Sequence, residues 1–281
     1  MSKYKKYLYF IGIMLLTAII VVSGFFLFDE CLEQKKQVED FRELEKIIEV
    51  SDKEESQEEQ ENADTTEITE ENEDVKDGLN VAKDIDLQKL YNINSDLIGW
   101  IKIDGTNLNY PVMQNGNFYL RKNFYKNYSS CGTPYLAEYC GLKTSDNLIL
   151  YGHHMDNKTM FSCLDNYKRF NFYKNHKYIK FYTLENGKTI ENTYEVIYAF
   201  KTIAYSEKGF KYNNFYVANS EEQYSEFISK CQELSFYDTG KTAQYGDKLI
   251  TLSTCEYSQK NGRMVVVAKK IWKAGVKICL K

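Results

Sequence analysis

The sequence predicts a mainly β domain whose strands form an antiparallel sheet closed into a barrel or sandwich. Residues 97–273 contain seven short runs rich in β-branched and aromatic side chains, and turn-forming stretches such as DGTN, ENGK and KNG separate them. Many short strands with few helices are typical of such sheets. An uncharged stretch near the N-terminus also predicts a single transmembrane helix before this domain.

The uncharged stretch runs from Leu8 to Phe28, and its 21 residues can cross a bilayer core of roughly 30 Å as a helix. Lysines precede it at positions 3, 5 and 6, and acidic residues follow it at positions 29 and 30. Because positive flanks stay in the cytoplasm, we expect residues 1–7 to be a cytoplasmic tail, residues 8–28 a single-pass cell-membrane anchor and later residues extracellular. A cleaved signal peptide is the alternative, but the apolar run exceeds the roughly 7 to 15 residues of such peptides and no small-residue cleavage site follows.

Residues 29–78 are predicted to form a helical stalk and an acidic linker. Apolar residues at mixed three- and four-residue steps indicate an amphipathic helix in the stalk: Leu32, Val38, Phe41, Leu44 and Ile48. Between Ser51 and Asp77, thirteen acidic residues stand against two lysines, and the apolar content is too low to offset the entropy of ordering. We expect a solvated linker that lets the distal domain stand off the membrane.

The folded domain is predicted to occupy residues 79–281. It opens with a short helix capped near Asp84, and its strands are expected at residues 97–103, 108–113, 147–152, 177–184, 192–203, 247–254 and 263–273. A helix is predicted before the penultimate strand, at residues 220–237, with Ser220 as its N-cap. Its apolar residues recur at helical spacing: Tyr224, Phe227, Ile228, Cys231 and Leu234.

The seven cysteines have no regular spacing, and their odd number leaves at least one thiol unpaired within this chain. Cys131 and Cys140 could form a disulfide, but their spacing is not that of a zinc site and no CxxC occurs. Every cysteine except Cys255 is interpreted as a small buried hydrophobic residue. Whether Cys255 is instead a reactive thiol has to be judged from its neighbouring residues.

Cys255 ends the run DKLITLSTC, and Arg263 opens the next run, RMVVVAKKI. In consecutive antiparallel strands the last residue of one lies beside the first of the next, so these two residues should meet at one end of the sheet. A guanidinium stabilises a thiolate, which is the attacking form of cysteine, and its N–H groups can bind an oxyanion. The pair is thus a candidate for nucleophilic catalysis.

A cysteine nucleophile also needs an acid or base, and histidine suits that role near neutral pH. His153 and His154 end the apolar run NLILYGHH directly after Gly152, a position typical of side chains that project into a cleft. His176 lies in a polar turn and is interpreted as an exposed surface residue.

Together these residues resemble the sortase family, and within it the class B branch. The resemblance rests on TLSTC with the following Arg263, on NLILYGHHMDNKTMF and on YNINSDLIGWIKIDGTNLNYPVMQ, and it covers residues from about 84 to 271. The segment CGTPYLAEYC departs from the usual family pattern of a glycine followed by aromatic, aliphatic and acidic residues. The implied fold is the sortase-type closed β-barrel, with an N-terminal helix and a helix inserted before the penultimate strand.

Carried over by position, the resemblance makes Cys255 the nucleophile, His153 the general acid and base, and Arg263 the stabiliser of the oxyanion and substrate. His153 is preferred to His154 because the catalytic histidine of the family directly follows the glycine. Glu256 either touches His153 or Arg263 or is a solvated loop acid. The candidates for substrate contact are Thr254, Ser253, Glu256 and His154.

The resemblance implies an extracellular cysteine transpeptidase that cleaves a C-terminal sorting motif after threonine, of the Asn-Pro-x-Thr-Asn or Pro-x-Thr-Gly type, through a thioacyl-enzyme. Its implied partners are secreted proteins that bear this signal and an amine from the peptidoglycan precursor lipid II or from a pilin. No metal or organic cofactor is expected, and scattered lysines argue against nucleic-acid binding. The alternatives are a membrane-tethered cysteine peptidase that uses water and a non-catalytic surface or pilus accessory protein.

Overall fold

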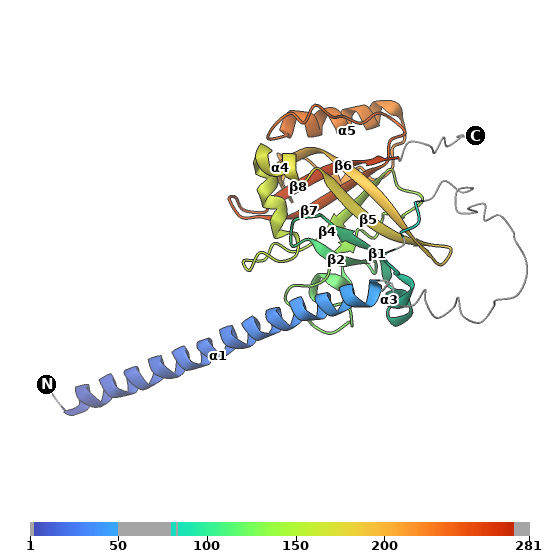
Figure 1. The fold of residues 1–281 in the computed structure, drawn as a ribbon. Coiled ribbons are helices and arrows are strands. Elements are labelled where there is room, and N and C mark those ends of the chain that lie inside the picture. Colours follow the sequence, from blue (N-terminus) through green and yellow to red (C-terminus); the bar gives the residue numbers. More distant parts are fainter. Residues whose placement is uncertain (1–2, 50–79, 83, 273–281) are drawn as a thin grey trace, which may run out of the picture.

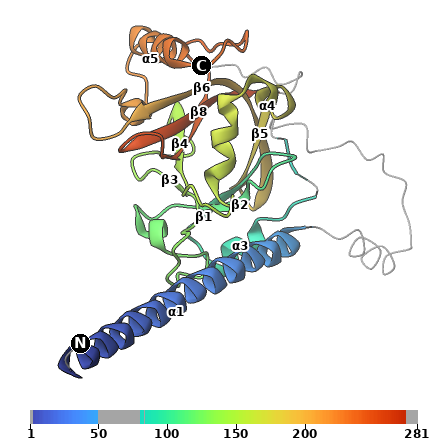
Figure 2. The same cartoon turned by 90° about the vertical axis from the view of Figure 1, so that its left-hand side faces the viewer.

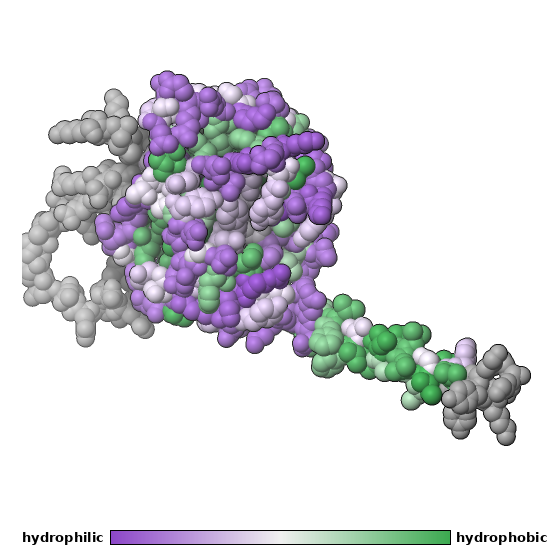
Figure 3. Space-filling model, turned by 180° about the vertical axis from the view of Figure 1, so that it is seen from behind, coloured by the Kyte–Doolittle hydropathy of each residue, from purple (hydrophilic) through white to green (hydrophobic). Residues whose placement is uncertain are grey.

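A computed structural model describes residues 3–49, 80–82 and 84–272 of the chain. The acidic linker predicted at residues 51–77 and the last cysteine, Cys279, lie outside these residues. The described chain forms a β-barrel from which one long helix, α1 (Lys3–Ile48), extends (Figure 1). The apolar part of α1 projects from a largely hydrophilic surface (Figure 3).

Eight strands close into a barrel in the order β1-β2-β3-β4-β7-β8-β6-β5, which confirms the mainly β class. All seven predicted strands are present, and the eighth is the two-residue β3, which is too short to show a periodic pattern. The strands are β1 (Leu97–Lys102), β2 (Asn109–Met113), β3 (Tyr135–Leu136), β4 (Asn147–Tyr151), β5 (Tyr178–Glu185), β6 (Lys188–Ile203), β7 (Leu249–Glu256) and β8 (Gly262–Ile271).

The barrel is not wholly antiparallel, which corrects the expectation from the sequence. β2 pairs with β3 in parallel, and β4 pairs with β7 in parallel. Parallel partners require a long crossover, and the chain between β4 and β7 supplies one because it includes β5 and β6. As a consequence β4 and β7 end at the same edge of the barrel, with Tyr151 beside Ser253.

Two predicted helices flank the barrel. α3 (Gln88–Ile93) begins after Leu87 and not near the expected cap Asp84, and the Asp86 carboxylate accepts the Gln88 N–H at 2.9 Å. α5 (Glu221–Leu234) lies between β6 and β7 in the chain, as predicted, and the Ser220 hydroxyl accepts the Gln223 N–H at 3.3 Å.

Four short helices were not predicted because each is too brief to show a helical period. The 3-10 helix η3 (Phe161–Lys168) and α4 (Phe170–Asn175) follow each other directly and cover one side of the barrel (Figures 1 and 2). The 3-10 helices η2 (Phe118–Arg121) and η4 (Tyr212–Asn214) lie in the connections after β2 and β6.

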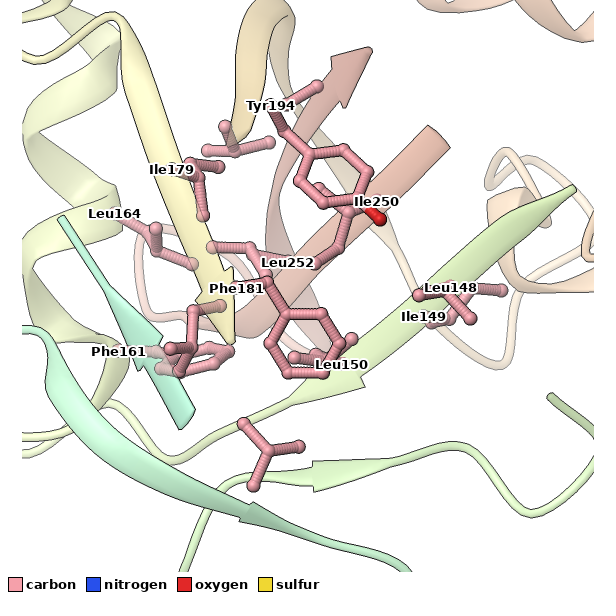
Figure 4. Close-up of a cluster of buried hydrophobic side chains, with 14 of the residues drawn as sticks. Leu148, Ile149, Leu150, Phe161, Leu164, Ile179, Phe181, Tyr194, Ile250 and Leu252 are labelled. Atoms are coloured by element: carbon pink, nitrogen blue, oxygen red, sulfur yellow. The ribbon is translucent and has the colours of Figure 1, made fainter. Parts of the chain in front are cut away.

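The core fills the barrel interior with side chains from all around the sheet. Leu150 from β4, Phe181 from β5 and Leu252 from β7 are fully buried there, together with Phe161 from η3 (Figure 4). This burial fixes the strand registers, because a one-residue slip would turn each apolar set outward.

The C-terminal part of α1 belongs to the same core as the barrel. Phe41, Leu44 and Ile48 are at most 4% exposed and lie in the main hydrophobic cluster. The end of α1 is also joined to the segment before α3, because the Asp86 N–H donates to the Ile48 carbonyl at 2.7 Å. This part of the predicted stalk is therefore packed on the barrel.

Candidate active site

The β7–β8 pair places Cys255 directly opposite Arg263 in the register, which confirms that the two residues meet at one end of the sheet. The hydrogen-bonded ladder continues from Leu249 opposite Lys269 to Glu256 opposite Gly262. The relative position of Cys255 and Arg263 is therefore held by backbone hydrogen bonds on both sides.

The parallel pairing of β4 with β7 brings the histidines to the same edge. The Gly152 N–H donates to the Ser253 carbonyl at 3.2 Å, which extends the pairing by one residue toward His153. A Cβ on Gly152 would lie 2.6 Å from the Phe161 ring, so only glycine lets the chain pass this core residue. His153 thus leaves the strand end beside the residues that precede Cys255.

The three candidate residues surround one cavity of about 100 Å³. Its walls come from the ends of β4, β7 and β8 and from the segment between β2 and β3. A wider hollow of about 550 Å³ adjoins it and shares Leu120, Tyr135, Tyr151 and Arg263. The residues around the small cavity are Leu120, Thr133, Tyr135, Tyr151, Gly152, His153, Ser253, Thr254, Cys255 and Arg263.

The His153 ring is held by the backbone of the segment after β2. Its Nε2 lies 2.8 Å from the Leu120 carbonyl oxygen, and since a carbonyl only accepts, Nε2 carries the proton. Nδ1 is then the nitrogen that can exchange a proton. Burial lowers the pKa of His153, the Leu120 hydrogen bond opposes this, and the Arg121 charge lowers it further, so the pKa lies below the ordinary 6.5. His153 is accordingly mostly neutral at pH 7.

Arg263 is half-buried, and most of its donors remain available. One guanidinium N–H donates to the Gly262 carbonyl at 2.9 Å, while the guanidinium carbon lies 5.9 Å from the centre of the Tyr205 ring. Tyr205 is 91% exposed and stands at the rim of the wider hollow. Arg263 therefore offers positive charge and hydrogen-bond donors to both hollows.

Ser253 and Thr254 line the cavity as expected, but their hydroxyl groups have different surroundings. The Ser253 Oγ is buried and lies 2.5 Å from the Tyr212 hydroxyl. The Thr254 Oγ1 is buried and has no hydrogen-bond partner among the described residues. The Ser253 hydroxyl is thus held by a hydrogen bond to Tyr212, whereas the Thr254 hydroxyl can still form hydrogen bonds.

Glu256 does not face the cavity, so neither expectation for it holds. It is 3% exposed, and its carboxylate forms a 2.7 Å ion pair with Lys168 of η3 and accepts the Ser258 N–H and hydroxyl. Burial raises its pKa, but the Lys168 and Ser258 hydrogen bonds outweigh this and the net pKa is lowered. The reason is strand alternation, which turns Glu256 to the face opposite Cys255.

His154 lies outside the lining of the small cavity, and its substrate contact stays a prediction. Its Nδ1 donates to the Cys255 carbonyl at 3.0 Å, and its ring lies against Tyr257 with centroids 5.2 Å apart. His154 therefore ties the two strand ends together through the backbone. His176 is half-buried rather than exposed, because it stacks on Phe172 with centroids 4.1 Å apart.

The remaining cysteines mostly follow the prediction. Cys131, Cys140, Cys163 and Cys231 are buried and free, so the considered disulfide between the first two is not formed. Cys31 is exposed on α1, which corrects its interpretation as a buried residue. Cys255 is only partly buried, so among the described cysteines it combines cavity access with a cationic neighbour.

Sequence reasoning missed several wall residues. Tyr151 could have been found, since it precedes the Gly152–His153 pair on the same strand. Leu120, Thr133 and Tyr135 carry no such signal, because they lie far from the motif residues in the chain and reach the cavity only through the fold. The arrangement of thiol, imidazole and guanidinium around one cavity suits acyl transfer through a covalent thioester.

Comparisons with known proteins agree with this geometry. The sortase domain model matches residues 101–271. Sortase B of Staphylococcus aureus is 34% identical over 189 residues, which cover 66% of this chain and 74% of that protein. The S. aureus sortase B–substrate complex has a TM-score of 0.66 at 29% identity, and the match covers 86% of this chain and 100% of the other. A sortase B complexed with triglycine has a TM-score of 0.59 at 32% identity, and the match covers 67% of this chain and 86% of the other. The chain belongs to the sortase family, in its class B branch, and is a cysteine transpeptidase.

Proposed function

We propose that Cys255 attacks the threonyl carbonyl carbon of a C-terminal sorting motif, with His153 as general acid and base and Arg263 as the oxyanion stabiliser. The observation that carries this assignment is the pairing of Cys255 with Arg263 at the cavity that His153 also lines. The Cys255 thiol gives its proton to neutral His153 as its sulfur forms a bond to the carbonyl carbon, and the guanidinium stabilises the negative charge on the carbonyl oxygen.

Collapse of this intermediate breaks the peptide C–N bond. The departing amine takes a proton from protonated His153, and the acyl group stays on Cys255 as a thioester. An acceptor amine then attacks the thioester, His153 removes the proton from the attacking nitrogen, and the Cys255 thiolate leaves. If water attacks instead, the same residues give hydrolysis, which is the peptidase alternative.

The proposed donors are secreted proteins with an Asn-Pro-x-Thr-Asn or Pro-x-Thr-Gly motif. One solved structure is a complex of S. aureus sortase B with its substrate, and another is a sortase B complexed with triglycine. These complexes support a peptide donor and a short glycine amine as the acceptor class. For this chain the acceptor is proposed to be an amine of the lipid II precursor or of a pilin.

We infer that α1 anchors the enzyme in the cell membrane with its N-terminus in the cytoplasm and the barrel outside. α1 is the one helix of the described residues that is long and apolar enough to span a bilayer, and no part of its apolar window is buried against the other described residues. Lysines before the apolar segment and acids after it support this orientation.

The test is intact-mass analysis of the full chain in detergent micelles, incubated with peptides that carry each motif, with and without triglycine. We expect a thioacyl adduct on the parent, a ligated product when triglycine is added, and neither in Cys255→Ala. Cys231→Ala is the matched control, because Cys231 is buried in the core away from the cavity.

Each outcome distinguishes the proposals. Cleavage without ligation at saturating amine would favour the peptidase. An adduct that persists in Cys255→Ala would exclude Cys255 as the nucleophile. Absence of both adduct and cleavage with every motif would contradict the proposed donors.

A further inference from the structure

We propose that Gln37 of α1 is a positioning residue for His153, which acts through the segment 119–133 that carries the Leu120 carbonyl. This inference rests on the proposed function, because it takes His153 as the catalytic acid and base. It gives the anchoring helix a part in the reaction in addition to membrane attachment.

Gln37 makes contacts that a solvated stalk residue would not make. Its side chain is 3% exposed, its Nε2 donates to the Gly132 carbonyl at 2.5 Å, and its Oε1 accepts from the Ser129 hydroxyl. A buried amide is costly unless both ends are hydrogen-bonded, and here both are. Gln37 therefore fixes the position of the 129–132 turn relative to α1.

That turn packs directly on the peptide group of Leu120. Gly132 has φ +59°, and a Cβ at this position would lie 2.6 Å from the carbonyl oxygens of both Tyr119 and Leu120. The Thr133 N–H donates to the Tyr119 carbonyl at 2.9 Å. With no side chain between them, a shift of Gly132 toward the Leu120 carbonyl oxygen would displace this carbonyl.

The Leu120 carbonyl in turn holds the Nε2 of His153 at 2.8 Å. Gln37, Gly132, Leu120 and His153 thus form one continuous series of contacts from the helix to the cavity. The segment that contains η2, drawn in green, lies between α1 and the barrel strands in Figure 2.

A second contact from the same edge of α1 supports the turn. The Glu33 carboxylate accepts the Ser130 N–H at 2.9 Å, and Glu33 lies one helical turn before Gln37. The Arg121 guanidinium donates to the Ser130 carbonyl at 3.0 Å, so a hydrogen bond also joins the two ends of the segment 119–133. Two successive turns of α1 therefore hold the segment that orients His153.

Loss of the Gln37 contacts should change the titration of His153 in a definite direction. The Leu120 hydrogen bond raises the pKa of His153, against burial and the Arg121 charge, which lower it. A displaced carbonyl would remove the raising contribution, so the pKa would fall further and less His153 would be protonated at neutral pH. The other titratable groups that line its cavity are Tyr135, Tyr151, Cys255 and Arg263.

The experiment compares the full chain in detergent micelles with Gln37→Met and Gln34→Met. Gln34 lies on the same helix and forms a hydrogen bond only with the exposed Asn157 side chain, so it is a matched control. The first readout is the His153 pKa from NMR titration, which is tractable because the chain has three histidines. The second is the pH profile of thioester formation, with kcat and KM determined separately.

We expect Gln37→Met to lower the His153 pKa and to lower kcat by about 10- to 100-fold with little change in KM, because a small displacement of a catalytic group has effects of that size. Gln34→Met should match the parent in both readouts. An unchanged His153 pKa in a folded Gln37→Met variant would overturn the inference, even if its thermal stability fell.

If Gln37→Met does not fold, Ser129→Ala takes its place. This variant removes only the hydroxyl that donates to the Gln37 side chain, and the same two readouts apply. If the parent forms no thioester, the proposed function fails. The NMR titration still decides the inference about Gln37 in that case, because it does not depend on turnover.

Discussion

The two walls of the active cavity are built in different ways. The strand wall consists of Gly152, His153, Ser253, Cys255 and Arg263, which sit at the ends of paired strands β4, β7 and β8. The loop wall consists of Leu120 and Thr133, which belong to a segment between β2 and β3 that side chains of α1 hold in place. Backbone ladders thus place the reacting groups, whereas side-chain hydrogen bonds place the groups that orient them.

This difference separates the expected mutational effects into two kinds. Changes in the strand wall should alter the chemistry without moving its residues, because the ladder remains. Changes in the loop wall should alter the protonation and position of His153. The following predictions run from the largest expected effect to the smallest.

Arg263→Gln should have the largest effect of these, through the strand wall. It removes the positive charge opposite Cys255 and keeps a polar side chain on an intact β8. We expect kcat to fall by about 100- to 1,000-fold, the usual cost of a lost oxyanion donor, with thermal stability close to that of the parent. Single-turnover thioester formation measures this, with Lys269→Gln on the same strand as the control. A decrease of less than tenfold would contradict an oxyanion role.

Gly132→Ala tests the loop wall. The new methyl group would meet two backbone carbonyl oxygens at 2.6 Å in a left-handed backbone conformation, so the Leu120 carbonyl must move. We expect kcat to fall by about tenfold or more. Gly187→Ala is the control, since Gly187 also has positive φ but a methyl group there would have nothing within 4 Å, and it should cost only about 1–2 kcal/mol of stability with full activity. Equal activity in the two variants would show that the segment does not orient His153.

Lys168→Met tests how much the ion pair between Lys168 and Glu256, behind the strand wall, contributes to stability. Without Lys168 the 3%-exposed Glu256 keeps only its Ser258 partners, and we expect a loss of about 1–3 kcal/mol at neutral pH with kcat little changed. The Glu256 pKa is lowered in the folded parent, so its stabilising contribution is present above the ordinary 4.5 and is lost as the pH falls through the folded value.

The difference in unfolding free energy between parent and Lys168→Met should therefore shrink as the pH falls below about 4.5. Denaturant unfolding at several pH values measures it. Lys174→Met, which removes an exposed lysine of α4, is the control. A difference that is independent of pH would mean that the pair contributes packing rather than charge.

Arg121→Gln should have the smallest effect, mainly on the pH profile, because the glutamine amide still offers an N–H donor for the Ser130 carbonyl that Arg121 contacts. Arg121 lowers the His153 pKa through its charge, so the variant should have a higher His153 pKa. His153 must be neutral to act as the base in the proposed reaction, so its protonation sets the acid limb. The acid limb of kcat/KM should therefore move to higher pH. Lys122→Gln removes a neighbouring charge that does not perturb His153 and should leave the limb in place.

The strand wall could be predicted from the sequence because its information is local. Cys255 and Arg263 are adjacent through a tight turn, and the alternation of β7 and β8 fixes which residues face each other. The family resemblance then identified the roles. What failed on this wall was Glu256, which was expected near the cavity although its alternation with Cys255 turns it to the opposite face.

The loop wall could not be predicted, because nothing local determines it. Leu120 reaches His153 only through tertiary packing, and Gln37 lies 95 residues before the glycine that it holds. The parallel pairing of β4 with β7 was likewise missed, since a period-2 pattern is the same for parallel and antiparallel strands. Sequence patterns report faces and turns, whereas these contacts depend on which distant segments meet.

The continuity of α1 also determines how far the enzyme can reach. Its first hydrogen bond to the barrel is made by Glu33, five residues after the apolar segment ends at Phe28, which is roughly 7–8 Å along the helix axis. Because Phe41, Leu44 and Ile48 of the same helix are packed in the core, the barrel is joined to the apolar segment through α1 itself. If α1 spans the membrane as proposed, the barrel is mounted at a fixed height just above the lipid headgroups, so donor and acceptor must both come to the membrane surface to react.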